Sequence, residues 1–157
     1  MIELHAWINQ TKTSVVSAWI DKVALSRRYA HPFDPYDLAI RFCQKHTRQF
    51  LALNHQAHRY TQVIFESRFK RHGRTARIEF QQIRTQANPL GHDQHDVSRF
   101  PIEPLFISKQ SNLAGHQRCE LLARPLAKWR FDPNSNQRPM QIIQTKLFAH
   151  KVFPQTG

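Results

Sequence analysis

A capped helix between two runs of β-forming residues is the feature that most limits how this chain can fold. Residues 34–53 (DPYDLAIRFCQKHTRQFLAL) start with Asp34 as a good N-cap and Pro35 at the first helical position. Apolar side chains then recur near the 3.6-residue period of a helix. Residues 13–20 (TSVVSAWI) and 60–67 (YTQVIFES) are rich in β-branched and aromatic residues, which predicts a strand on either side. Strands that alternate with helices predict an α/β fold with some parallel pairing.

The remaining segments continue this alternation. Helices are predicted in residues 74–86, 114–129 and 138–150, and a short helix or loop in residues 22–33. Residues 88–100 hold Pro, Gly, Asp and His and predict a loop, and residues 104–108 (PLFIS) predict a third strand. Because 157 residues can bury a sizeable core in one domain, we expect a single domain over residues 1–157.

The strongest bulk property is positive charge. Lys and Arg number 23 against 11 Asp and Glu, which gives a formal net charge of +12 and favours nucleic acid, DNA or RNA, as the partner. No segment approaches the roughly 20 apolar residues of a membrane span, and no signal segment is seen, so we expect a cytoplasmic protein without a membrane partner. With only four Gly residues, the sequence contains no P-loop or dinucleotide-binding turn. Cys43 and Cys119 form no CxxC motif, which favours two reduced thiols.

The acidic residues provide one candidate metal site. Glu66 ends the second predicted strand, and Gln117 and Glu120 stand three residues apart, on one face of the helix predicted at 114–129. That helix follows the third strand and can return Glu120 toward Glu66. Carboxylate oxygens suit Mg²⁺ or Mn²⁺, so Glu66 and Glu120 are candidate metal ligands and, with Gln117, candidate catalytic residues. The alternative that both carboxylates are simply solvated stays open.

Basic and polar residues surround these carboxylates in the sequence. The candidate nucleic-acid contacts are Arg68, Lys70, Arg71 and Arg74, which follow Glu66, and Lys109 and Asn112, which precede the helix. A nuclease requires cations that contact the phosphates of its substrate, next to a carboxylate that holds a metal ion. Asp21 and Lys22 close the first strand and would lie on the edge of a parallel sheet where ligands gather. A solvated helix entrance and ordinary turns remain alternatives for these residues.

Three separate stretches share their order and spacing with one family: WIDKVALSRRYAHPFDPYDLAIRF, IFESR and FISKQSNLAGHQRCELLARPLAKW. Together they resemble the carboxyl-terminal two thirds of the prokaryotic family catalogued as domain of unknown function 3800. The match runs from about Ala18 to the closing KVFP. The resemblance implies an RNase-H-like mixed sheet flanked by helices and a metal-dependent nuclease activity. It implies Glu66 and Glu120 as metal ligands, Gln117 as a positioning group, and Lys109 and Arg68 as phosphate contacts.

The sequence departs from this family at several positions. Residues 1–20 lack the family's first acidic motif, an Asp-Glu-Ser-Gly-like turn, and Glu120 stands where the family has Asp. Phe69 replaces a Gly, and Gly73 and Arg74 replace acidic residues. Because two-metal hydrolysis needs several carboxylates, we expect an amino-terminally shortened RNase-H-like domain related to nucleases, in which loss of the first motif threatens activity. The alternatives are a non-catalytic basic nucleic-acid-binding protein and a degenerate fragment without selected function, for which unpaired backbone favours a strand-swapped dimer.

Overall fold

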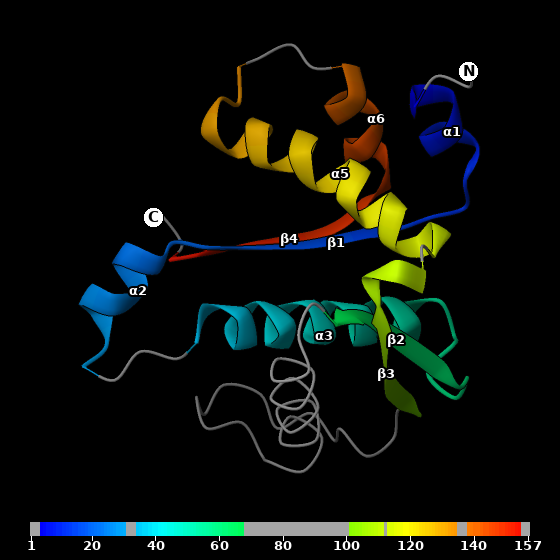
Figure 1. Ribbon diagram of the computed structural model, residues 1–157, viewed down its shortest axis with the longest axis horizontal. Helices are drawn as coiled ribbons and strands as arrows, with labels where there is room; N and C mark the ends of the chain where they lie inside the picture. Colours follow the sequence, from blue (N-terminus) through cyan, green and yellow to red (C-terminus); the bar gives the residue numbers. More distant parts are fainter. Residues whose placement is uncertain (1–3, 31–33, 68–100, 112, 135–137, 155–157) are drawn as a thin grey trace. The chain divides into compact units, whose positions relative to one another are not determined.

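Helices and strands are interspersed along this chain, and the described strands form parallel pairs (Figure 1). The computed structural model describes residues 4–30, 34–67, 101–111, 113–134 and 138–154. The described elements are α1 (Leu4–Gln10), β1 (Val15–Ile20), α2 (Lys22–Arg28), α3 (Pro35–Leu53), β2 (Thr61–Ser67), β3 (Ile102–Ser108), the 3₁₀ turn η2 (Lys109–Ser111), α5 (Ala114–Phe131), α6 (Arg138–Lys146) and β4 (Leu147–Phe153). The predicted α/β class with parallel pairing is confirmed. The helix predicted at 74–86 and the loop at 88–100 lie outside the described residues.

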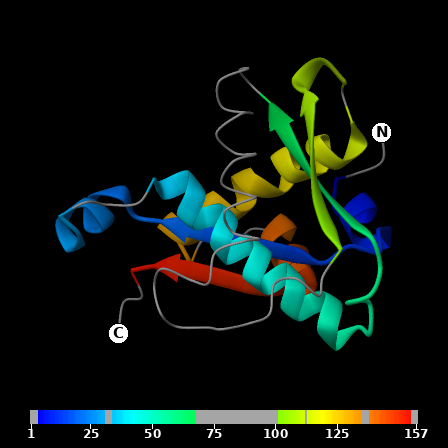
Figure 2. The ribbon, with the colours of Figure 1, turned by 90° about the horizontal axis from the view of Figure 1, so that it is seen from below.

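The described strands form two pairs, β1 with β4 and β2 with β3. In the second pair the register runs from Thr61 opposite Ile102 to Ser67 opposite Ser108, and the two strands lie side by side in Figures 1 and 2. In the first pair Ser17 contacts His150, and the backbone N–H of Asp21 donates to the carbonyl of Phe153 at 2.9 Å. From the first of these contacts to the second, the residue numbers increase in both strands, so this pair is parallel as well.

Helix α3 begins and ends for local reasons. The Asp34 carboxylate accepts a hydrogen bond from the Tyr36 N–H at 2.7 Å, and Pro35 follows it at the first helical position, as predicted. At the other end the Asn54 N–H donates to the Phe50 carbonyl at 3.1 Å, and His55 takes a left-handed conformation with φ 55°. A left-handed residue just past the last turn ends a helix, because it cannot continue the right-handed path.

The chain divides into two compact units, residues 1–17 with 112–150 and residues 18–111 with 151–157. The first unit packs α1, α5 and α6 around Ile8, Met140 and Ile143. The second has a core of Leu51 and Ile102, against which Phe50, Val63 and Phe65 pack from α3 and β2. The expectation of one domain over residues 1–157 stays a prediction.

The carboxyl-terminal segment corrects the sequence prediction. Helix α6 ends at Lys146, and residues 147–153 form strand β4 instead of prolonging the helix predicted at 138–150. The Lys146 ammonium donates to the carbonyls of Asn9 and Thr11 at 3.1 and 2.8 Å, which joins the end of α6 to the segment between α1 and β1. Helix α1 was not predicted either. None of the helices in the described ranges has the length and apolar character needed to cross a bilayer.

Candidate functional site

Glu66 lies next to the carboxyl end of β2, as predicted. Its partner in the parallel register is Ile107, and Ser67 at the end of β2 lies opposite Ser108 at the end of β3. Because the two strands are parallel and end in register, their carboxyl ends form one edge. The side chain of Glu66 is half-buried, whereas a carboxylate in open solvent would be fully exposed. This edge therefore holds an acidic side chain that is partly withdrawn from water.

The turn that follows β3 belongs to the same edge. Ser108 accepts a hydrogen bond from the Gln110 N–H at 3.1 Å through its hydroxyl, which starts the 3₁₀ turn η2 at Lys109. The backbone of Lys109 therefore directly follows the residue that pairs with Ser67. Two of the predicted site residues, Glu66 and Lys109, are brought to one sheet edge by this register. Their assignment as site residues stays a prediction.

Asp21 has a structural task that the sequence analysis did not assign. Its carboxylate accepts hydrogen bonds from the Val23 and Ala24 N–H groups, both at 2.9 Å, and so caps α2. Lys22 is the first residue of that helix. Among the strands the structure describes, β1 pairs with β4 and not with β2 or β3, so Asp21 and Lys22 end a different strand pair from Glu66. The assignment of Asp21 and Lys22 as site residues stays a prediction.

Gln117 and Glu120 lie on the exposed side of α5, three residues apart as expected for one helix face. The opposite side of α5 packs Leu122, Leu126 and Trp129 against the core of the first unit. Glu120 belongs to that unit and Glu66 to the other, and the convergence of the two carboxylates stays a prediction.

The remaining predicted nucleic-acid contacts lie outside the described residues: Arg68, Lys70, Arg71, Arg74 and Asn112. Within the described ranges, no group of three or more His, Cys, Asp or Glu side chains is arranged to hold a metal ion. Glu66 offers the oxygen donors that hard cations prefer, so its chemistry fits Mg²⁺ or Mn²⁺, which stay predicted cofactors.

Sequence reasoning missed a serine–histidine contact in the first unit. The Ser17 hydroxyl and His150 Nδ1 lie 2.6 Å apart, and the Trp129 ring is tilted over the imidazole with centroids 5.3 Å apart. Burial lowers the pKa of His150, and the positive charge of Arg130 lowers it further. The aromatic and β-branched residues of LFAHKVF were the available signal, because Phe148, Val152 and Phe153 favour a strand over a helix.

Sequence reasoning also missed a group of rings and cations in the second unit. Tyr29 at the end of α2, Phe42 in α3 and Phe153 at the end of β4 lie together, and Arg28 and Lys151 lie over two of these rings.

Comparisons with protein-family models, curated proteins and solved structures give no match for this chain. The resemblance to the domain of unknown function 3800 family therefore stays a prediction.

Proposed function

We propose that this chain is an RNase-H-like protein related to metal-dependent nucleases, acting on nucleic acid with Glu66 as a metal ligand. One observation carries the proposal: half-buried Glu66 and the turn starting at Lys109 lie at the shared carboxyl edge of the parallel β2–β3 pair. In open α/β sheets ligands bind outside the carboxyl ends of the strands. A carboxylate at that edge is therefore located where such a fold binds its substrate.

The proposed roles divide between metal binding and phosphate binding. Glu66 and Glu120 would hold Mg²⁺ or Mn²⁺, and Gln117 on the same face of α5 would position the scissile phosphate. Lys109 and Arg68 would contact phosphate oxygens. When bound, the metal stabilises the charge on the attacking and leaving oxygens of phosphodiester hydrolysis.

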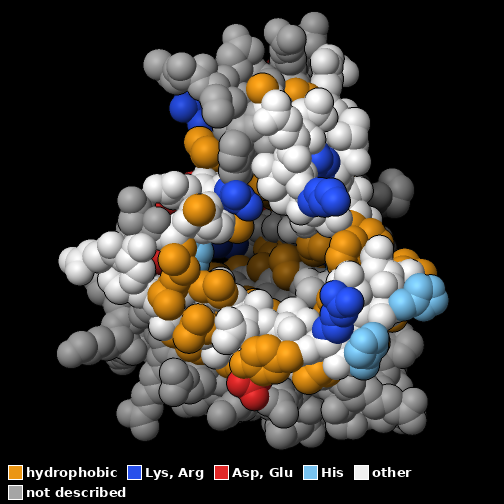
Figure 3. All heavy atoms as spheres, turned by 90° about the vertical axis from the view of Figure 1, so that its right-hand side faces the viewer, with side chains coloured by type: hydrophobic (Ala, Val, Ile, Leu, Met, Phe, Trp, Pro, Cys, Tyr) orange, Lys and Arg blue, Asp and Glu red, His pale blue; other side chains and the backbone are white. Residues whose placement is uncertain are grey.

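A second candidate is a non-catalytic nucleic-acid-binding protein, and the net charge of +12 favours it independently of Glu66. On the face drawn in Figure 3, Lys and Arg side chains are more frequent than Asp and Glu among the described residues. A surface of this kind attracts a phosphate backbone whether or not a metal site is complete.

Calorimetric titration of Mn²⁺ into the purified protein tests the metal site. We expect saturable binding in the wild type that is lost in Glu66→Gln and in Glu120→Gln. Glu103→Gln is the matched control, because Glu103 lies on β3 opposite Gln62, near the amino end of the same strand pair. It should bind Mn²⁺ like the wild type.

Fluorescence anisotropy with labelled oligonucleotides then separates the two candidates. Cleavage that needs Mn²⁺ and is lost in Glu66→Gln, with nucleic-acid affinity kept, supports the nuclease. Nucleic-acid binding without saturable Mn²⁺ binding refutes the nuclease and leaves the non-catalytic binder. Absence of nucleic-acid binding contradicts both.

A further inference from the structure

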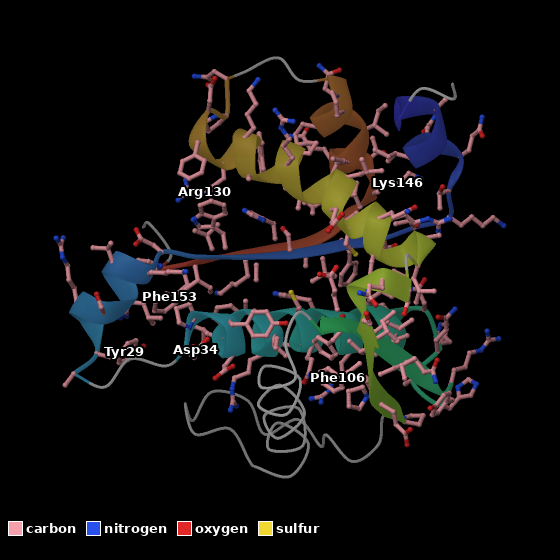
Figure 4. The ribbon with its side chains drawn as sticks, viewed as in Figure 1. Tyr29, Asp34, Phe106, Arg130, Lys146 and Phe153 are labelled. Atoms are coloured by element: carbon pink, nitrogen blue, oxygen red, sulfur yellow. The ribbon has the colours of Figure 1, made fainter. Side chains whose placement is uncertain are left out.

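Three aromatic rings and two cations gather at one place in the second unit. We call this group the Phe153 cluster: Tyr29, Phe42, Phe153, Arg28 and Lys151. Arg28 and Tyr29 come from the end of α2, Phe42 from α3, and Lys151 and Phe153 from β4. Figure 4 labels Tyr29 and Phe153, two of the rings in this cluster. None of these residues belongs to the site proposed around Glu66.

The rings are close but do not cover one another fully. Tyr29 and Phe153 are nearly parallel, with an interplanar angle of 18° and centroids 6.4 Å apart. Phe42 is tilted by 36° against Phe153, with centroids 6.5 Å apart. Both distances are near the upper end of the roughly 4.5–7 Å range of aromatic pairs, so the rings are in contact without stacking closely on one another.

The burial of the cluster also differs from that of a closed core. All three rings are half-buried, whereas Leu25 in the adjacent helix α2 is only 1% exposed. Arg28 is exposed, and its guanidinium carbon lies 5.8 Å from the Phe153 ring centroid. Lys151 Nζ lies 5.6 Å from the Phe42 centroid. The cluster therefore combines accessible aromatic surface with cations already held at ring faces.

We propose that the Phe153 cluster binds single-stranded nucleic acid, with bases stacking on Tyr29 and Phe153 and phosphates contacting Arg28 and Lys151. The inference rests on the proposed function in taking nucleic acid as the partner. Every base has a π face that an aromatic ring can stack on, and cations beside the rings follow the backbone. In a duplex the base faces are covered by their neighbours, so such a cluster selects single strands.

The cation contacts favour binding by ordering the side chains beforehand. A guanidinium held over a ring loses less conformational freedom when a phosphate arrives than one free in solvent. Asp34, at the start of the helix that carries Phe42, is a negative charge that opposes phosphate. Its carboxylate is occupied with the Tyr36 N–H at the positive end of helix α3, which offsets part of that charge.

Fluorescence anisotropy with a labelled thymidine strand of about 12 nucleotides, within the usual site size, and with its duplex tests the inference. Tyr29→Leu and Phe153→Leu should each lower affinity for the single strand by about 5- to 150-fold, since one stacked base is lost. Tyr29→Phe keeps the ring and should bind like the wild type. The affinity for the duplex should change little in all three variants.

Arg28 has a matched control in the neighbouring residue. Arg27 and Arg28 are both exposed in the last turn of α2, and the structure shows the Arg28 guanidinium over the Phe153 ring. Arg28→Gln should weaken binding to the single strand more than Arg27→Gln does, and should reduce the slope of log affinity against log salt by about 0.7.

The outcomes separate this inference from the proposed function. If the wild type binds single strands and the ring variants, folded by circular dichroism, bind equally well, the cluster serves only packing and the inference fails while the proposed function stands. If Tyr29→Leu and Phe153→Leu unfold, equal effects of Arg28→Gln and Arg27→Gln overturn the inference, and a larger effect of Arg28→Gln supports it. If the wild type binds no nucleic acid, the proposed function fails as well.

Discussion

Replacement of Gln44 by Met should stabilise this protein. Gln44 in α3 is 6% exposed, and neither its amide oxygen nor its amide nitrogen has a hydrogen-bond partner in the described part of the chain. Leaving a buried polar group unpaired costs about 1–3 kcal/mol, because its hydrogen bonds to water are lost and not replaced. Met has a similar length and shape without the amide, and repacking after such an exchange usually costs less than about 1.5 kcal/mol.

The expected net gain is therefore about 1–2 kcal/mol in the free energy of unfolding. For a chain of this size that raises Tm by about 2–8 °C, which thermal unfolding by circular dichroism and urea titration both resolve. Gln144→Met is the matched control, since Gln144 is an exposed glutamine in α6 and should change stability by less than about 0.5 kcal/mol. A Gln44→Met protein that is no more stable than the wild type would refute the reasoning, and would mean that the folded protein satisfies this amide.

Two further predictions concern ionisable side chains. Burial, and then the charge of Arg130, lower the pKa of His150 in the folded protein. The unfolded chain therefore takes up the proton first, once pH falls below about 6.5. The free energy of unfolding that His150 contributes at neutral pH is then lost as pH falls toward the pKa of the folded state. Urea unfolding at several pH values should show a weaker pH dependence below neutrality in His150→Asn than in the wild type, and an equal pH dependence in the two proteins would contradict this reasoning. Asp34→Ala removes the acceptor for the Tyr36 N–H at 2.7 Å and should cost about 0.5–2 kcal/mol in chemical unfolding. Asp34→Asn should retain most of that stability, and equal losses in both variants would contradict a capping role.

The parts of the fold that follow from short stretches of sequence could be predicted. Asp34 and Pro35 determine where α3 begins, and the β-forming residues before Glu66 predict β2. What short stretches cannot show is which strands pair. Ser17 and His150 are 133 residues apart in the sequence, so the pairing of β1 with β4 depends on long-range packing. The same reason explains why β4 was predicted as helix.

The candidate site shows the same division. The position of Glu66 at a strand end follows from its neighbours in the sequence, whereas the register that brings Lys109 to the same edge does not. The Phe153 cluster could not be predicted, because Tyr29, Phe42 and Phe153 come from three elements that only the folded chain assembles. In the sequence, each ring alone is typical of a core residue. Only the folded structure shows that Arg28 and Lys151 lie over the rings.

Binding and cleavage should be separable in this chain if both proposals hold. Glu66 lies on the β2–β3 pair, and the Phe153 cluster is built at the end of β4, so each can be changed without touching the other. In single-strand cleavage with Mn²⁺, Tyr29→Leu should raise KM by about 5- to 150-fold and leave kcat unchanged, since a stacked base is bound equally in the ground and transition states. Glu66→Gln should instead lower kcat and leave affinity for the strand intact. A fall in kcat with unchanged KM in Tyr29→Leu would contradict this division, because it would mean that the ring contributes only in the transition state.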